Sequence, residues 1–108
     1  MTVADLAKKL SLQAVSACEE EREITGVYVG DLLSWVMGRA ESGNVWITIM
    51  SNVNVLAVAT LADVACVILA EGVALDDDAL VKSQREGINV LSSNESAYEI
   101  CARLSTLL

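Results

Sequence analysis

The sequence of 108 residues contains no histidine, no proline and no phenylalanine, and aromatic residues make up only 4% of it. Without histidine, every catalytic scheme and every metal site that depends on imidazole is excluded. Basic residues are also scarce, because 7 lysines and arginines are outnumbered by 15 aspartates and glutamates, which gives a net charge of −8. A chain this acidic is unsuited to nucleic acid or to an anionic membrane surface, so we expect neither as a partner.

Sequence motifs for catalysis are missing as well. The chain has no G-x-x-x-x-G-K-[ST] phosphate loop, no G-x-G-x-x-G motif and no nucleophile next to a base. The consecutive aspartates Asp76, Asp77 and Asp78 are compatible with a divalent metal, but adjacent side chains point in different directions. Acidic residues are also favoured at the start of a helix, which is the interpretation we adopt. We therefore predict that the protein is not an enzyme and has no cofactor and no metal.

Cysteines are few and widely separated. Cys18, Cys66 and Cys101 form no C-x-x-C pair, so they predict neither a disulfide framework nor a zinc or iron–sulfur site. We interpret them as small core residues of a reduced, cytoplasmic protein. The N-terminal residues also lack the pattern of a signal peptide.

One long stretch is apolar enough to suggest a membrane span. Residues 45–75 contain only two charges, but Asn52, Asn54 and Asp63 interrupt them, and an aspartate near the centre of a membrane helix costs about 2.5 to 3.5 kcal/mol. A buried strand, helix and strand explain the same composition without that cost.

The hydrophobic pattern alternates between short apolar runs and helical spacing. Strands are expected over residues 13–17, 24–30, 45–49, 65–70 and 88–91, and helices over 3–10, 32–40, 54–61, 77–86 and 97–107. Helix starts are expected at Thr2 with Asp5, at Asp31, at Asp76, and at Ser92 with Glu95. The pattern predicts a single α/β domain over residues 1–108, with a mainly parallel central sheet of four to five strands covered by helices on both faces.

The helix expected from Asn54 has almost no polar side. Its apolar residues include Val55, Leu56, Val58 and Ala59. A helix that is apolar all round lies in a core or against a second surface. For so small a domain we expect these four residues to form a subunit interface, with a homodimer as the assembly.

Polar side chains follow three of the expected strands. In open parallel sheets, ligands bind beyond the carboxyl ends of the strands. The candidate ligand-binding residues there are Ser51, Asn52 and Asn54 after the third strand, Glu71 and Gly72 after the fourth, and Ser92, Ser93 and Asn94 after the fifth. The alternative is that Asn54, Ser92 and Asn94 only cap helices.

Three sequence blocks resemble the DRTGG domain family. They are residues 22–34 (REITGVYVGDLLS), 45–49 (VWITI) and 54–59 (NVLAVA), and the likeness extends from Val3 to about Leu104. The resemblance implies a three-layer α/β/α domain similar to the N-terminal domains of HPr kinase/phosphorylase and of Mur ligases. It also implies a regulatory or dimerising role, as in phosphotransacetylases and in pyrophosphatases with CBS domains.

The sequence matches the family's pattern at one place and departs from it at another. Thr25 and Gly26 match, so they join the candidate ligand-binding residues; the alternative is that Gly26 allows a tight turn. The Asp-Arg-Thr motif of the family is replaced by residues 51–54 (SNVN), which puts an anion-binding role of that pair in doubt here.

Two functions follow as hypotheses. The first is a non-catalytic regulatory or dimerisation module that senses a small ligand at the strand ends and has a regulatory protein partner. The second is a small-molecule binding protein whose main ligand is a nucleotide or a phosphorylated metabolite, held by Asn52, Asn54, Glu71 and Ser92.

Overall fold

The computed structural model describes residues 1–108 and contains a five-stranded sheet with the order β1-β5-β4-β3-β2. The strands are β1 (Gln13–Ser16), β2 (Gly26–Val29), β3 (Asn44–Thr48), β4 (Cys66–Leu69) and β5 (Val90–Ser92). The helices are α1 (Val3–Lys9), α2 (Leu33–Arg39), α3 (Asn54–Ala62), α4 (Asp77–Glu86) and α5 (Ala97–Leu104). Strands β2 to β5 are parallel, and only β1 is antiparallel to its neighbour β5. The predicted mainly parallel sheet is confirmed.

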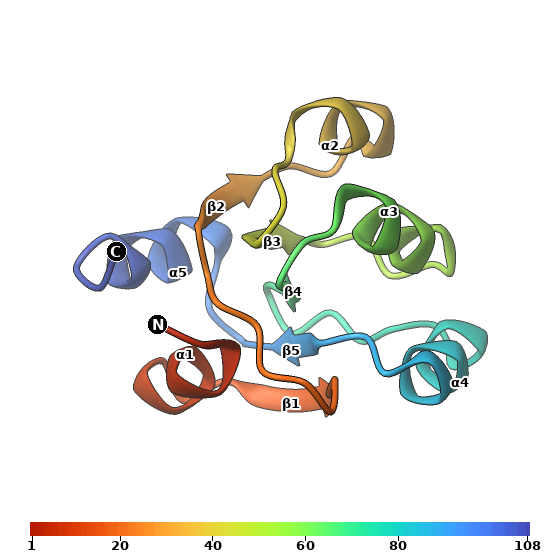
Figure 1. Ribbon diagram of the computed structural model, residues 1–108, viewed down its shortest axis with the longest axis horizontal. Coiled ribbons are helices and arrows are strands. Elements are labelled where there is room, and N and C mark those ends of the chain that lie inside the picture. The colour runs from red at the N-terminus through yellow and green to blue at the C-terminus, as the bar shows by residue number, and fades with distance from the viewer.

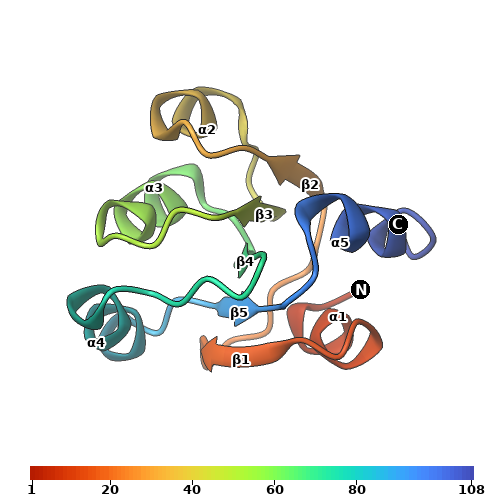
Figure 2. The ribbon, with the colours of Figure 1, turned by 180° about the vertical axis from the view of Figure 1, so that it is seen from behind.

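The order of the strands decides which helices cover which face of the sheet. From β2 to β5 each new strand is added on the same side of the previous one, so right-handed crossovers place α2, α3 and α4 on one face. Figure 1 shows these three helices together on one side, with α1 and α5 on the other. The reverse view in Figure 2 shows the same arrangement. The three-layer α/β/α architecture is therefore confirmed.

Each face of the sheet has its own hydrophobic core. Val45 and Ile47 of β3 pack in the cluster that contains Leu6 of α1 and Ile100 of α5. Trp46, which lies between them, packs in the other cluster, under α2, α3 and α4. All three strand residues are fully buried, which explains why β3 is continuously apolar rather than alternating.

The apolar character of α3 has a different cause from the expected one. Val55, Leu56, Val58 and Ala59 are all buried in the core beneath the helix, so the expected subunit interface through these four residues needs correction. Helix α3 lies between α2 and α4 and over the middle of the sheet (Figure 1), and the chain itself covers the side of the helix that carries these four residues. Its exposed residues are Asn54, Ala57, Thr60 and Leu61.

Helix starts differ from the prediction at two places. The capping box of Thr2 and Asp5 is confirmed. The second capping box is formed by Ser96 and Glu99, so the expected box of Ser92 and Glu95 is wrong. Ser92 is instead the last residue of β5, because that strand begins and ends later than its apolar run suggests.

Asp31 does not cap α2 as expected. Leu32 occupies the N-cap position, without a side-chain hydrogen bond. The Asp31 carboxylate instead accepts hydrogen bonds from the Thr48 hydroxyl at 2.8 Å and from the Ile49 N–H at 3.0 Å. It thereby joins the carboxyl ends of β2 and β3.

The three cysteines are unpaired and differ in burial. Cys66 is buried in β4, and burial raises the pKa of its thiol to about 12. Cys18 and Cys101 are half-buried, and burial also raises the pKa of the Cys101 thiol. Separately, no helix of the chain has both the length and the apolar character needed to cross a membrane.

We predict that Leu56→Ala lowers the free energy of unfolding by about 2 to 5 kcal/mol, because it leaves a cavity in the core. Leu61→Ala on the same helix is the control, since Leu56 is 1% exposed and Leu61 is 72% exposed. The control is expected to change stability by less than about 0.5 kcal/mol. Urea unfolding of the two variants measures the difference, and equal losses would contradict the inward orientation of Leu56.

Candidate functional site

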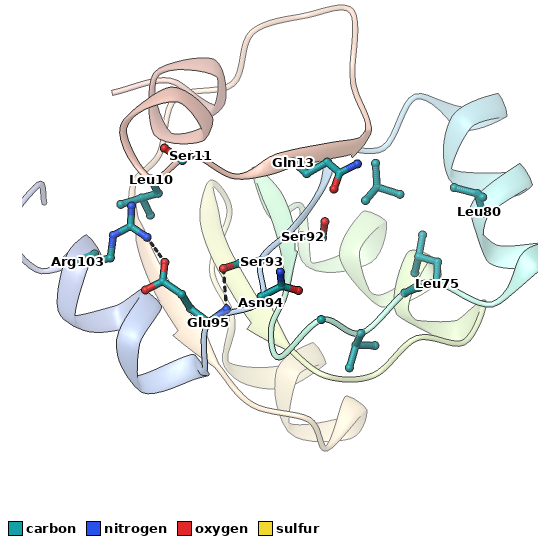
Figure 3. A pocket seen from close by; sticks show the side chains of 14 residues that line it. Leu10, Ser11, Gln13, Leu75, Leu80, Ser92, Ser93, Asn94, Glu95 and Arg103 are labelled. Atoms are coloured by element: carbon teal, nitrogen blue, oxygen red, sulfur yellow. Dashed lines mark hydrogen bonds and ion pairs between the residues drawn. The ribbon is translucent and has the colours of Figure 1, made fainter.

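A cleft of about 560 Å³ lies at the carboxyl ends of β4 and β5. It is bounded by the turn between α1 and β1, by β1 itself, by the loops after β4 and β5, and by α4 and α5. Its lining residues are Leu10, Ser11, Gln13, Val15, Gly72, Val73, Ala74, Leu75, Leu80, Ser92, Ser93, Asn94, Glu95 and Arg103. Figure 3 shows these side chains from close by. We call this the switch-point cleft, for the reason given next.

The topology of the sheet creates the cleft. After β4 the chain leads to α4 on one face, whereas after the neighbouring β5 it leads to α5 on the opposite face (Figure 1). Two adjacent parallel strands whose following helices diverge in this way open a crevice at their carboxyl ends, the usual ligand site of open α/β sheets. Here β1, which is antiparallel, brings its amino end to the same edge and closes the third side.

One side of the switch-point cleft is polar. Gln13 and Ser92 are direct partners across the β1–β5 pair, and Asn94 follows two residues after Ser92. None of these three side chains forms a hydrogen bond within the protein, and no buried side-chain polar atom of the chain lacks a partner, so their polar atoms are accessible. They provide two amides and one hydroxyl, which both donate and accept hydrogen bonds.

The other side of the cleft is apolar. Leu75 and Leu80 lie across from the polar residues in Figure 3, and Val15 extends this surface on the α4 side of β1. Leu75 is buried and belongs to the core beneath α4, whereas Leu80 and Val15 pack only partly against that core. The cleft thus has a rigid apolar wall, continuous with the core, opposite a row of hydrogen-bonding groups.

The two loops of the cleft are fastened to each other by backbone hydrogen bonds. The N–H groups of Glu71 and Gly72 donate to the carbonyl oxygens of Glu95 at 2.8 Å and Ser93 at 2.9 Å, respectively. The Ser93 hydroxyl accepts from the Glu95 N–H at 3.0 Å. The Glu95 carboxylate forms an ion pair with Arg103 of α5. The charged groups that line the cleft therefore neutralise each other.

Unusual backbone conformations lie at the rim. Ser11 and Glu71 are in the left-handed region with φ of 52° and 57°, and only one other residue that is not glycine, Asp63, shares that feature. Such conformations are held only where the surrounding structure enforces them, and they concentrate at functional sites.

The structure separates the expected ligand-binding residues into three places. Ser92 lines the switch-point cleft, and Glu71 is on its rim next to Gly72. Ser51, Asn52 and Asn54 lie at the carboxyl end of β3, outside the cleft. The Ser51 hydroxyl donates to Asp76 at 3.1 Å, and the Asn52 side chain accepts from the Asn54 N–H at 2.9 Å, so these groups stabilise the loop and the start of α4.

Thr25 and Gly26 lie at the opposite end of the sheet, where the parallel strands begin. The Thr25 hydroxyl donates to the Ser42 carbonyl oxygen at 2.7 Å and accepts from the Asn44 amide at 3.4 Å. These contacts tie β2 to the turn that precedes β3. The structure therefore does not bring Thr25 and Gly26 together with the residues of the cleft.

The same end of the sheet carries a shifted carboxyl group. The Ser42 hydroxyl donates to Asp63, and Arg22 pairs with Asp63 at 3.1 Å. The hydrogen bond from Ser42, followed by the charge of Arg22, lowers the pKa of the Asp63 carboxyl. Nowhere in the chain do three or more Cys, Asp or Glu side chains gather in a group that could hold a metal ion.

Sequence reasoning missed Gln13 and Arg103. Gln13 reaches the cleft because β1 is antiparallel and pairs with β5, a register that the local pattern of β1 does not reveal. Arg103 lies near the end of α5, and its side chain extends toward the beginning of the helix, as helical side chains generally do. No local spacing indicates the pair of Glu95 and Arg103, because Glu95 precedes the helix and lies eight residues before Arg103.

Comparison with known proteins gives a match in structure only. No family model and no curated protein sequence matches the chain. A solved structure of the regulatory region of Clostridium perfringens pyrophosphatase, with its CBS and DRTGG domains and the activator diadenosine tetraphosphate, matches with a TM-score of 0.76. The match has 14% sequence identity and covers 95% of this chain and 45% of that one. The chain thus spans less than half of the matched chain, and the likeness establishes a shared fold.

We predict that Gly72→Ala lowers the free energy of unfolding by about 1 to 2 kcal/mol, because a left-handed conformation is unfavourable for alanine. Gly72 has a φ of 72°, and an added Cβ would lie 3.0 Å from the Asn94 side-chain oxygen. Gly38 in α2 is the control, because a Cβ there has nothing within 4 Å. Gly38→Ala should raise stability by about 0.5 to 1 kcal/mol. Thermal unfolding of both variants measures the effects, and stabilisation by both would refute the left-handed turn at Gly72.

Proposed function

We propose that the chain is a regulatory module of the DRTGG type, without catalysis of its own, that binds a small ligand in the switch-point cleft. The observation that carries the proposal is the position of this cleft at the carboxyl ends of β4 and β5, whose following helices diverge to opposite faces of the sheet. The similarity to the N-terminal domains of HPr kinase/phosphorylase and of Mur ligases, a cytoplasmic location and a regulatory protein partner belong to the same proposal. The three unpaired cysteines fit a reducing compartment.

The size and chemistry of the cleft support ligand binding over catalysis. A volume of about 560 Å³ is within the range of roughly 300 to 1,000 Å³ that small-molecule sites occupy. The lining combines an apolar wall with a few polar groups, and it offers hydroxyls, amides and one ion pair but no cysteine and no histidine. The matched solved structure is also a regulatory region.

The cleft is placed so that a ligand would contact both helical layers. Leu80 belongs to α4 on one face of the sheet, and Arg103 belongs to α5 on the other. A ligand that touches both would favour one relative position of the two layers, which is the differential contact that regulation requires. A binding protein whose main role is to hold a nucleotide or phosphorylated metabolite is the second candidate. The phosphate group of this ligand would have to compete with Glu95 for Arg103, the one basic residue of the lining.

We predict that a small-molecule ligand stabilises the chain and that Ala74→Trp abolishes this effect. Ala74 is exposed and lines the cleft, so a larger side chain there fills the cleft without disturbing the core. At 100 times its Kd a ligand adds about 2.7 kcal/mol, which raises the melting temperature of a domain this size by roughly 10 °C. The measurement is a thermal-shift panel of nucleosides, nucleotides, phosphorylated metabolites and amino acids.

The matched control is Ala57→Trp, because Ala57 is an exposed alanine of α3 outside the cleft. The control should keep the stabilisation by the ligand. If no compound stabilises the native chain, or if Ala74→Trp keeps the full shift, the cleft is not the ligand site.

We further propose that self-association occurs along β2 rather than through α3. Strand β2 is at the edge of the sheet and pairs only with β3. The other edge, β1, is interrupted by a bulge, and Gln84 donates to its Val15 carbonyl oxygen at 3.3 Å. Edges without such protection tend to pair with another strand.

The chemistry around β2 favours a second copy of the chain as its partner. Val27 and Val29 are exposed and line an apolar groove of about 310 Å³ with residues of α5, and no side chain of that groove is charged. Two copies of a chain with a net charge of −8 repel each other least where neither presents charged side chains. Antiparallel pairing of β2 about a two-fold axis would place Val27 of one copy opposite Val29 of the other.

We predict that Val29→Lys converts a dimer of twice 11.5 kDa into a monomer, because it places a charge in the apolar groove beside the exposed edge of β2. Val81→Lys is the control, since Val81 is 59% exposed on α4 and the charge change is the same. Sedimentation velocity at micromolar concentration, together with circular dichroism to confirm folding, distinguishes the variants. A monomeric native chain, or a dimer that persists in Val29→Lys, would disprove the β2 interface.

A further inference from the structure

The charges of the switch-point cleft leave no cation free for an anionic ligand. Arg103 is the only basic residue of the lining, and it is paired with Glu95. A phosphate group that took Arg103 would leave the Glu95 carboxylate, which is only 29% exposed, without its partner. Glu71 on the rim and the net charge of −8 add to the cost of bringing an anion to this place.

The start of α5 does not offer an alternative anion site. Its first turn already holds a carboxylate, because Glu99 accepts from the Ser96 N–H at 3.1 Å while the Ser96 hydroxyl accepts from the Glu99 N–H at 3.2 Å. A second negative charge would lie beside Glu95 and Glu99. The cleft is thus suited to a ligand that has no net negative charge.

The polar side of the cleft offers both hydrogen-bond donors and hydrogen-bond acceptors in one row. Gln13 and Asn94 each have a carbonyl oxygen that accepts and an amide nitrogen that donates, and Ser92 between them does both through its hydroxyl. Amide side chains of this type pair with adjacent donors and acceptors on the edge of a nucleobase. Leu75 and Leu80 lie opposite, where they can cover the apolar face of a flat ring.

The remaining part of the cleft accepts hydroxyl groups. In Figure 3, Glu95 and Arg103 lie at one end of the cleft and the leucines Leu75 and Leu80 at the other. A carboxylate that is already paired with a guanidinium still accepts hydrogen bonds from sugar hydroxyls, because each of its oxygens has two lone pairs. A ring against the leucines and a hydroxylated substituent near Glu95 would use both ends.

We propose that the switch-point cleft binds an uncharged nucleobase or nucleoside, and that it discriminates against the corresponding phosphate esters. This inference rests on the proposed ligand-binding function of the same cleft. The base edge pairs with Gln13, Ser92 and Asn94, the base face lies against Leu75 and Leu80, and the sugar hydroxyls donate to Glu95.

The experiment compares four nucleosides (adenosine, guanosine, cytidine and uridine) with their 5′-monophosphates by isothermal titration calorimetry on the full chain. At least one nucleoside is expected to bind about tenfold or more tightly than its monophosphate. The experiment is carried out at about 50 mM and about 500 mM salt. The affinity for the nucleoside should be the same at both concentrations, because no ion pair forms between the nucleoside and the protein.

Two variants and one control assign the contacts. Asn94→Ala and Gln13→Ala should each weaken nucleoside binding by about tenfold, because each removes a hydrogen-bonding partner. Asn54→Ala should leave binding unchanged, since Asn54 is an exposed asparagine outside the cleft. Thermal unfolding without ligand verifies that the variants fold.

The possible results separate this inference from the proposed function. Tighter binding of monophosphates, lost in Arg103→Gln, would overturn the neutral ligand but keep the ligand site. If only other compounds of the thermal-shift panel bind, and Ala74→Trp blocks that binding, the nucleoside ligand is likewise wrong and the ligand site is kept. If no compound binds in the cleft at all, both the neutral ligand and the proposed ligand site are wrong.

Discussion

The single direction in which the parallel strands are added is the constraint on which the remaining structure depends. Because β2, β3, β4 and β5 follow one another across the sheet, their right-handed crossovers place three helices on one face. The second face then has to be covered by the first and last helices, α1 and α5 (Figure 2). After β4 the chain leads to one face of the sheet and after β5 to the other, and the switch-point cleft lies beside the two loops at this point. The site is thus a by-product of covering both faces of the sheet.

The cleft differs electrostatically from the molecule that contains it. The chain has a net charge of −8, yet the charged groups of the cleft form a neutral pair, and the polar groups that remain are amides and hydroxyls. Amides and hydroxyls distinguish ligands by shape and by hydrogen-bonding pattern rather than by charge. Residues 51–54 (SNVN) carry no charge, and their side chains stabilise a loop outside the cleft.

Local sequence patterns were sufficient to predict the helices and strands, but not to predict which of them lie next to each other in the fold. The helix over residues 77–86 was predicted to the residue as α4, and the Val- and Ile-rich runs marked every parallel strand. Val55, Leu56, Val58 and Ala59 were recognised as buried, but burial inside the chain and burial against a second subunit give the same pattern. Ser92 was placed at the correct edge of the sheet, whereas Gln13 was missed because only the pairing of β1 with β5 brings it there.

The layer formed by α1 and α5 also constrains how the chain folds. Leu6 near one end of the sequence and Ile100 near the other belong to the same core. Contacts between residues so distant in sequence form late and slow the folding of a domain. During synthesis, the part of this face that α5 covers stays exposed until that helix has left the ribosome, so the nascent chain exposes apolar strand residues during that interval.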